Sequence, residues 1–224
     1  PPRSTPLYSS AASDVYKRQL GERDTLGDVL ASSEADAWLE WLRGRPLIET
    51  GEIAGEVFVM VHASVHPDWT EEDCLQAAAR VESQLRAPDL DSVCGFLSQR
   101  AEDAAPGSDR DLLGRVISCR GVQGENWASR PPAADSDAEP WHRPWRARGH
   151  AYGVVYGHWA VQGLHLAPGL RGLDTGCVHH GRGRDGYLTA WLPASAEDPP
   201  GVSPFRVDAP TLWRVPARRR YYPY

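Results

Sequence analysis

Residues 57–64 are VFVMVHAS, a run of five apolar residues followed directly by a histidine and two small residues. This pattern predicts a buried strand that ends at His62 and is followed by a tight turn. The stretch GVVYGHW at 153–159 repeats the pattern and places His158 just beyond a second apolar run. Because functional groups gather at the carboxyl ends of strands in open α/β sheets, we expect His62 and His158 to meet at one metal ion.

The two histidines also have a structural interpretation, which their spacing alone favours. A histidine at the end of a strand is commonly a hydrogen-bonded structural residue. A metal ligand has to be a neutral imidazole held in one orientation, and the end of a rigid strand provides that as well. The pattern therefore leaves both roles open.

The composition limits the classes of function. The chain has 224 residues, enough for one domain with a sizeable core or two small ones, and its net charge of −6 does not indicate a nucleic-acid-binding surface. The four cysteines form no C-x-x-C pair, which is typical of free thiols in a reducing cytoplasm. No apolar run approaches the ~20 residues of a membrane span, and the N-terminus does not resemble a secretory signal. We expect a cytoplasmic protein with no membrane or nucleic-acid partner and no evident protein partner.

The first half of the chain is predicted to be helical apart from one hairpin. The strand at 52–63 is its second arm, with 47–50 as the first arm and 51–55 as the turn. Trp38 and Trp41 are expected to pack in the core and at its edge. Residues 112–119 fit either a helix end or a strand. Apolar spacing, caps and breakers predict three helices, which follow an N-cap at Ser33, run over 70–86 with Thr70 as the cap, and run over 90–100.

The second half is predicted to be richer in strands and loops. Residues 121–148 lack periodicity and are rich in Pro, Asp and Trp, which indicates a long surface excursion. Short strands at 152–156, 169–173 and 187–192, separated by Gly-rich turns, suggest an antiparallel sheet region. Residues 196–224 are rich in Pro and then basic, and we expect them to pack weakly or not at all.

Residues 1–19, PPRSTPLYSSAASDVYKRQ, show neither a helical nor a strand period. They resemble a translated sequencing adapter, which implies that the open reading frame was cut here; a natural disordered arm is the alternative. The predicted organisation is an adapter-derived segment at 1–19, an incomplete domain at 20–195 and a Pro/Arg-rich tail at 196–224.

The remaining candidate motifs do not support a site. No G-x-G-x-x-G, Walker A, G-x-S-x-G or H-E-x-x-H motif is present, and a single D-T-G at 174–176 is not enough for an aspartic protease. The adjacent His179 and His180 lie among Gly and Arg, so we do not expect them to bind metal. The other loop histidines are expected to be solvated, namely His66, His142, His150 and His165.

An ordered set of short motifs resembles one family, the bacterial symmetrical diadenosine tetraphosphatases. Each motif is weak alone, whereas their shared order and spacing are specific. The stretches at 61–69 and 157–160 are similar to the family's H-A-G-x-x-P-x-W and G-H-W-A. In chain order the motifs are DTLGDVL at 24–30, LEWLR at 39–43 with RPL at 45–47, VHA at 61–63 with Pro67 and Trp69, GHWA at 157–160 and LDTGCV at 173–178.

The resemblance implies an α/β fold, the C-terminal portion of a calcineurin-like metallophosphoesterase two-sheet sandwich with flanking helices. It implies a hydrolase with two ions of the Mn²⁺ or Co²⁺ type, which bind phosphoryl oxygens and activate a bridging hydroxide. His62 and His158 would be ligands of the same ion, and Asp174 would support that ion indirectly or be structural. The substrate would be a small dinucleoside polyphosphate, diadenosine tetraphosphate, cut symmetrically into two ADP.

The chain departs from the family in two ways. The family's G-D-x-H-G, G-D-x-x-x-R-G and G-N-H-D motifs are absent. They carry the other metal, the bridging Asp and the catalytic His, and in the family they precede the segment that begins here near Leu20. One truncation explains these losses, so we expect that no catalytic residue is retained and that the chain is inactive. In addition, Ser64 replaces a Gly, and Val122–Glu125 stands where the family has an Arg-containing segment, which leaves substrate specificity open.

Two alternatives remain open, a phosphoprotein phosphatase of the same superfamily and a catalytically dead interaction module. The stretches at 157–160 and 174–177 argue against the phosphatase. Upstream genomic sequence would separate the rest: a contiguous G-D-x-H-G and G-N-H-D would establish a cut enzyme, and a natural start codon near Leu20 would favour the dead module.

Overall fold

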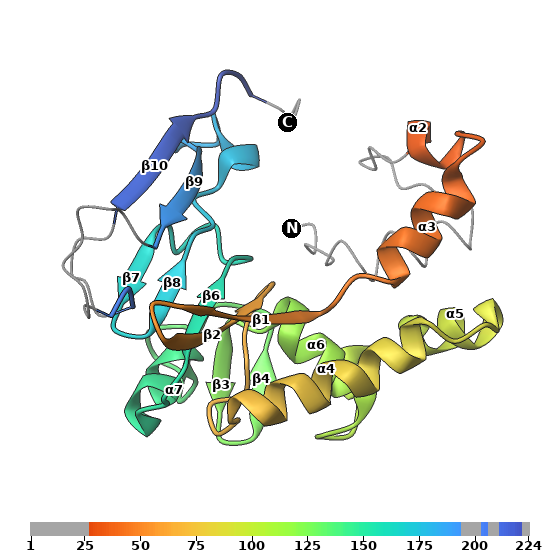
Figure 1. Ribbon diagram of the computed structural model, residues 1–224, viewed down its shortest axis with the longest axis horizontal. Helices are drawn as coiled ribbons and strands as arrows, with labels where there is room; N and C mark the ends of the chain where they lie inside the picture. Colours follow the sequence, from red (N-terminus) through yellow and green to blue (C-terminus); the bar gives the residue numbers. More distant parts are fainter. Residues whose placement is uncertain (1–26, 194–202, 206–210, 221–224) are drawn as a thin grey trace. The chain divides into compact units, whose positions relative to one another are not determined.

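The computed structural model describes residues 27–193, 203–205 and 211–220 (Figure 1). The chain divides into two compact units, one formed by Pro1–Leu47 with Gln76–Gly114 and the other by Ile48–Leu75 with Arg115–Tyr224. Where it is described, the first unit is helical, and all the described strands belong to the second. The mixed α/β class predicted from the sequence is confirmed.

Helices α4 (Glu71–Leu85) and α5 (Leu90–Ser98) begin where the sequence predicts. The Thr70 hydroxyl accepts from the Asp73 N–H at 3.1 Å, and the Asp73 carboxylate accepts from the Thr70 N–H at 2.9 Å, so the two residues cap α4 reciprocally. The Asp89 side chain caps α5. The other helices of this half are α2 (Gly27–Leu30), α3 (Ala35–Arg43), the 3-10 helix η1 (Ala101–Asp103) and α6 (Asp109–Ser118), so the stretch 112–119 is the end of a helix and not a strand.

Helix α3 differs from its prediction at its start and on its apolar face. It begins after Glu34 rather than Ser33, and no side chain caps it. Trp38 and Trp41 are 48% and 51% exposed, so the prediction that they pack in and beside a core is wrong. The two rings contact each other edge to face, and Leu39 alone is the buried residue of α3.

Apolar side chains of α4, α5 and α6 form the core of the first unit. Arg43 fastens the end of α3, because its Nε donates to the Leu85 carbonyl at 2.7 Å and its Nη2 to the Ala87 carbonyl at 2.5 Å. The buried core residues of this unit include Val81, Leu85, Val93, Leu97, Leu112 and Leu113.

In the second unit, β1 (Ile48–Ile53) and β2 (Glu56–Val61) form the predicted hairpin. Its turn contains only Ala54 and Gly55, both with positive φ, so the turn predicted at 51–55 was too long. Gly51 lies inside β1 because the Phe58 ring covers it, and a Cβ at this position would come within 2.8 Å of the ring.

The central sheet has the strand order β1-β2-β6-β8-β7. Strand β6 (Gly153–Tyr156) runs parallel to β2, β8 (Leu170–Gly172) runs parallel to β6, and β7 (His165–Ala167) is antiparallel to β8. The predicted antiparallel pairing is therefore wrong for β6 and β8, because each follows its neighbour through a crossover rather than a hairpin. The parallel pairing brings the carboxyl ends of β2 and β6 to the same edge.

The segment 121–148 is a structured part of the unit, and its prediction as a surface excursion is wrong. It contains β3 (Gly121–Gln123), β4 (Asn126–Ala128) and β5 (Glu139–Pro140), a small antiparallel sheet with β3 in the middle, and α7 (His142–Arg148). Trp141 and Trp145 are only 1% and 2% exposed. Burial of these two large rings explains why a stretch without periodicity is ordered.

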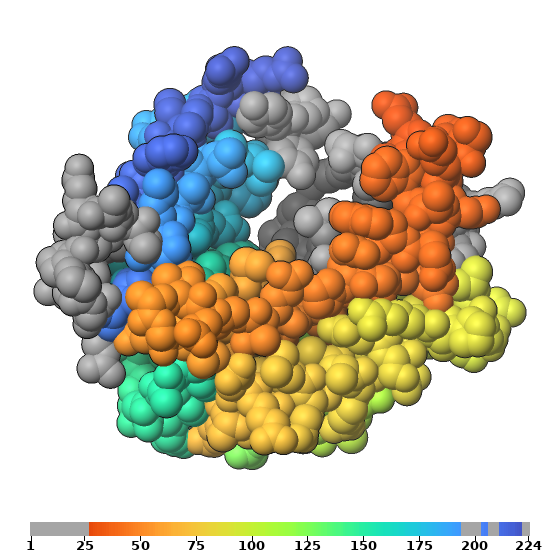
Figure 2. Space-filling model, in the orientation of Figure 1, coloured from red at the N-terminus to blue at the C-terminus, as the bar shows by residue number. Residues whose placement is uncertain are grey.

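Strand β9 (Tyr187–Leu192), which follows the 3-10 helix η2 (Cys177–His179), pairs antiparallel with β10 (Thr211–Pro216), as Figure 1 shows, and the atoms of this part of the chain are blue in Figure 2. Phe205 is buried against Gly153, where a Cβ would come within 2.5 Å of its ring. The predicted weak packing of 196–224 is therefore wrong for 203–205, whereas 211–216 pairs with β9 but leaves most of its side chains exposed. The rest of that tail, apart from 217–220, and all of 1–19 lie outside the described residues, so the predicted domain boundaries remain predictions.

None of the four cysteines is disulfide-bonded. Within the described ranges, no helix has the length and apolar character needed to cross a membrane.

Candidate metal centre

His62 and His158 lie side by side where the neighbouring parallel strands β2 and β6 end. Val61 and Tyr156, the last residues of these strands, are register partners, and the Gly157 N–H donates to the His62 carbonyl at 3.0 Å. The Nε2 atom of His62 lies 3.1 Å from Nδ1 of His158, and the ring centres are 4.9 Å apart. The structure therefore brings together the two histidines that the sequence paired.

The backbone at His158 is strained. Its φ is 66°, a left-handed value that residues other than glycine seldom adopt, and the Trp159 N–H donates to the Gly157 carbonyl at 2.7 Å. A hydrogen bond across two residues with a positive φ at the central one defines the rarer, strained form of the γ-turn. Strain of this kind persists only where the surroundings hold it, and it is concentrated at functional sites.

Both imidazoles are kept neutral. Burial lowers the pKa of His62, with smaller contributions from the Asp174 carboxylate, which raises it, and the Arg120 guanidinium, which lowers it. Burial lowers the pKa of His158 to about 3, and the charges of Arg120 and His62 act in the same direction. The buried Nε2 of His158 has no hydrogen-bond partner among the described residues. Neutral rings are the form in which histidine binds a metal ion.

Asp174 lies just beyond β8, in the predicted L-D-T-G-C stretch. Its Oδ1 accepts from the Gly176 N–H at 3.0 Å, which closes a local turn. The carboxylate is near enough to raise the pKa of His62, but in the described part of the chain Asp174 does not join the two histidines in a compact three-ligand group. Its predicted supporting or structural role remains a prediction.

Arg120 is the residue of this site that the sequence analysis missed. Its Nη2 donates to the His158 carbonyl at 3.3 Å and its Nη1 to the Ser129 carbonyl. The family resemblance implies an Arg-containing segment where this chain has Val122–Glu125, which the structure places in and beside the β3–β4 turn. Arg120 could have been identified from the sequence because it stands only two positions before that segment.

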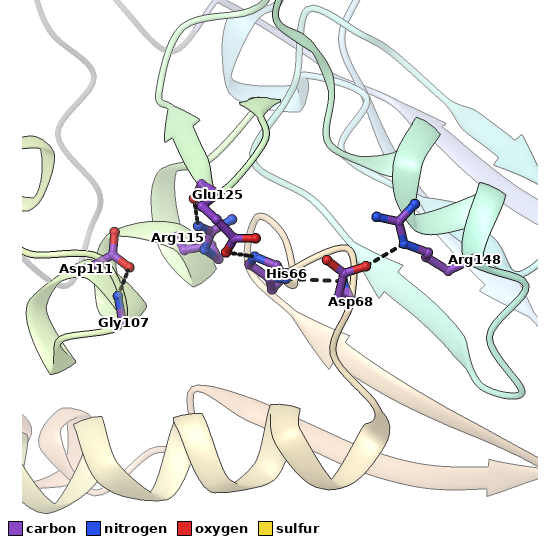
Figure 3. A network of polar contacts seen from close by, with 7 residues as sticks. All are labelled: His66, Asp68, Gly107, Asp111, Arg115, Glu125 and Arg148. Carbon is purple, nitrogen blue, oxygen red and sulfur yellow. Dashed lines mark hydrogen bonds and ion pairs between the residues drawn. The ribbon is translucent and has the colours of Figure 1, made fainter.

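A second group of potential ligands surrounds His66 (Figure 3). His66, Asp68 and Glu125 each offer one ligand atom, and these atoms lie within 4.8 Å of one another. His66 is only 9% exposed, so the prediction that it is solvated is wrong. It is buried because the loop after β2 packs its ring against Trp69, 5.6 Å away.

The hydrogen bonds at His66 decide its tautomer. The Asp68 N–H donates to Nδ1 at 3.1 Å, so Nδ1 carries no proton and the neutral ring carries it on Nε2. That nitrogen lies 3.2 Å from a Glu125 carboxylate oxygen, to which it donates. Arg148 pairs with Asp68, and the hydrogen bond between them lowers the pKa of Asp68. As arranged, the group is a hydrogen-bonded network that presents no free imidazole lone pair.

Three histidines besides His66 were also predicted to be solvated, and the structure corrects this. His142 is 8% exposed, and its Nε2 lies 2.9 Å from Nε2 of Gln162. His165 is half-buried, with its ring centre 4.2 Å from that of His142. His150 is hydrogen-bonded to the Pro67 carbonyl at 2.7 Å. Each packs against other rings of the same unit, which a single stretch of sequence does not reveal.

Comparison with curated proteins identifies a set of relatives with one shared name. A protein of Ralstonia nicotianae is 37% identical over 74% of this chain and 60% of its own length, and one of Paracidovorax citrulli is 35% identical over 73% and 62%. A protein of Nitrosomonas europaea is 32% identical over 78% of this chain and 67% of its own length. All three are called symmetrical bis(5'-nucleosyl)-tetraphosphatase.

The chain belongs to the symmetrical bis(5'-nucleosyl)-tetraphosphatase family. It spans about 60 to 67% of the length of these relatives. No protein-family model matches it. The family resemblance predicted from the motifs is thus confirmed, and the family is one of hydrolases.

In this tetraphosphatase family member, the two motif histidines provide a defined set of donor atoms. Two neutral nitrogens face each other from adjacent strand ends, with one cation, Arg120, and one carboxylate, Asp174, near enough to shift the pKa of His62. Such a pair can supply two ligands to a borderline divalent ion. Burial lowers the pKa of both rings, which favours the unprotonated form that can bind a metal ion.

Proposed function

We propose that His62 Nε2 and His158 Nδ1 bind one divalent ion of the Mn²⁺ or Co²⁺ type in a hydrolase that cuts dinucleoside tetraphosphates symmetrically. The observation that carries the proposal is their separation of 3.1 Å at the ends of adjacent parallel strands. Two metal–nitrogen bonds of about 2.1 Å at a right angle place their nitrogens about 3.0 Å apart. The fold that accompanies this function is a calcineurin-like two-sheet sandwich.

The chemistry of the donor set fits such an ion. Burial lowers the pKa of both rings, which favours the neutral form that binds a metal ion, and the Nε2 of His158 is buried without a partner among the described residues. When bound, an ion of this type polarises a phosphoryl oxygen and lowers the pKa of its bound water. The chain's own contribution is to hold two neutral nitrogens in a fixed relation.

Two imidazoles alone make a weak site. They supply no negative charge, and the 224 residues contain none of the G-D-x-H-G, G-D-x-x-x-R-G or G-N-H-D sequences that would add carboxylate and amide ligands. We therefore expect this polypeptide to bind Mn²⁺ weakly and not to hydrolyse diadenosine tetraphosphate. Measured turnover by the purified chain, at a rate that follows protein concentration, would contradict this part of the proposal.

A Co²⁺ titration followed by its visible absorption tests the proposed ligands. We expect His62→Ala and His158→Ala each to abolish the Co²⁺ spectrum. His66→Gln is the matched control, because it removes a less exposed histidine from the other candidate group and should leave the titration unchanged. If His66→Gln loses Co²⁺ binding and His62→Ala retains it, the ion binds at the His66 group, and the proposal is refuted.

The same protein separates the alternative functions. A phosphoprotein phosphatase would release phosphate from a phosphoserine peptide, and an interaction module would bind no Co²⁺ at His62 and His158. The stretches GHWA and LDTGC favour the tetraphosphatase assignment over the phosphatase. Peptide dephosphorylation without tetraphosphate hydrolysis would reverse this preference.

A further inference from the structure

The strained turn at Gly157–Trp159 must be held by contacts outside itself. The φ of His158 is 66°, and relaxation of this turn would move the imidazole away from its partner ring. The short hydrogen bond from Trp159 to Gly157 is internal to the turn, so it cannot fix the turn in the unit. The bond from Gly157 N–H to the His62 carbonyl fixes only the entry of the turn. The central carbonyl, that of His158, needs its own partner.

Arg120 provides that partner from a rigid position. Its backbone N–H donates to the Ala128 carbonyl at 2.9 Å, and its carbonyl accepts from the Trp141 N–H at 3.1 Å. The side chain then reaches outward, with Nη1 donating to the Ser129 carbonyl and Nη2 to the His158 carbonyl at 3.3 Å. The planar guanidinium can hold two carbonyls at once in fixed directions, which an ammonium cannot do equally well.

We propose that Arg120 is the positioning residue that holds the left-handed turn of His158 and thereby keeps its Nδ1 facing His62. The effect on metal binding rests on the proposed function of the pair, whereas the effect on the turn does not. Arg120 contacts the backbone of His158 and not its ring, so its role is to fix the position of the backbone from which the ring projects. Removal of such a supporting contact lowers metal affinity by about tenfold or more in other proteins.

The charge of Arg120 predicts the opposite result, which makes the proposal testable. A guanidinium beside a cation site repels the ion, so an arginine that acted only through its charge would weaken metal binding. Replacing it by a neutral residue would then tighten binding, and replacing it by lysine would change nothing. If the two hydrogen bonds from the guanidinium to backbone carbonyls matter more than its charge, Arg120→Lys weakens metal binding although the charge is retained.

The experiment measures two quantities in the full chain, the Co²⁺ affinity and the exchange rate of the Trp159 amide proton by NMR. The variants are Arg120→Lys and Arg120→Gln. The matched control is Arg43→Lys, because Arg43 also donates hydrogen bonds to two backbone carbonyls but belongs to the other unit. We expect Arg120→Lys to weaken Co²⁺ binding by about tenfold and to accelerate Trp159 exchange, while Arg43→Lys changes neither quantity.

Two results would overturn the proposal. One is unchanged Trp159 exchange in Arg120→Lys and Arg120→Gln. The other is tighter Co²⁺ binding in Arg120→Gln together with unchanged binding in Arg120→Lys. If the wild-type chain binds no Co²⁺, the proposed metal function fails, and the amide exchange still decides the role of Arg120. If one variant fails to fold, the chemical shift of the Trp159 amide proton in the other variant still decides whether Arg120 holds the turn.

Discussion

The His62–His158 pair and the His66–Asp68–Glu125 group both begin on the loop after β2, yet they use their ring nitrogens in opposite ways. At His66, Nδ1 accepts from a backbone N–H and Nε2 donates to Glu125. At His158, Nδ1 shares a hydrogen bond of 3.1 Å with Nε2 of His62, and Nε2 has no partner among the described residues. The group with more ligand-type residues is thus the one in which both ring nitrogens of its histidine are hydrogen-bonded, so residue counts alone do not identify a metal site.

The charged neighbours of the two groups differ in the same sense. Asp68 is paired with Arg148, and Arg115 donates to the Glu125 carbonyl at 2.7 Å, so cations already occupy the surroundings of the second group. Around the pair, the nearby charges are one of each sign, Asp174 and Arg120. A divalent ion would compete with two arginines at His66 and would have only one near the pair.

The first prediction asks whether hydrogen-bond partners or burial set the charge of these imidazoles. His142 and His66 are about equally buried, at 8% and 9% exposure. Burial, with nearby cationic groups, lowers the pKa of His142 to about 3, whereas the pKa of His66 is lowered by burial and partly restored by Glu125. Because only His66 has a carboxylate partner, His142 and His66 should contribute unequally to the loss of stability in acid.

The sign follows from proton uptake on unfolding. Below pH 6.5 the unfolded chain protonates His142 and the folded chain does not, so this contribution to the free energy of unfolding falls as the pH drops from 6.5 towards 3. At pH 5 the loss is about 2 kcal/mol. We expect urea unfolding at pH 7.5 and pH 5.0 to show that His142→Gln removes this part of the acid loss. A larger effect from His66→Gln would mean that Glu125 does not offset burial.

The second prediction tests backbone strain, which only one of the two groups contains. His158 has a positive φ and His66 does not. At a positive φ, glycine avoids a strain that alanine suffers, so His158→Gly should be more stable than His158→Ala by about 1 kcal/mol. At His66 the order should reverse by a similar amount, since glycine there only adds freedom to the unfolded chain. Chemical denaturation of the four variants measures both differences, and the same order at both positions would mean that the turn at His158 is not strained.

The sequence predicted the parts of this fold that depend on local signals. The cap at Thr70, the strand that leads to His62 and the strand that ends at Tyr156 all follow from neighbouring residues. The parallel pairing and the order of 121–148 depend on contacts between distant residues. Trp141 and Trp145 look like surface residues in a stretch without periodicity, and their burial becomes visible only when α7 is placed.

For the candidate site, the sequence identified the two rings but not what holds them. Their pairing was foreseeable because both follow apolar strands and occur in family motifs. Arg120 was missed since its contact is with a backbone carbonyl, which no residue type announces. His66 was misjudged for a related reason, because its partner Glu125 is 59 residues away in the chain.

The smallest effect is expected at the edge of the second group, at Arg148. Its ion pair with Asp68 joins side chains that are 52% and 49% exposed, so Arg148→Ala should lower the free energy of unfolding only slightly, and less still in high salt. Arg80→Ala, which breaks the exposed pair with Asp109, is the matched control. The informative measurement is the Co²⁺ titration of Arg148→Ala. If the ion binds at His62 and His158, the loss of Arg148 leaves its affinity unchanged. If it binds at His66, removal of a cation that competes for the Asp68 carboxylate tightens binding, and that single change of sign would move the metal centre from one group to the other.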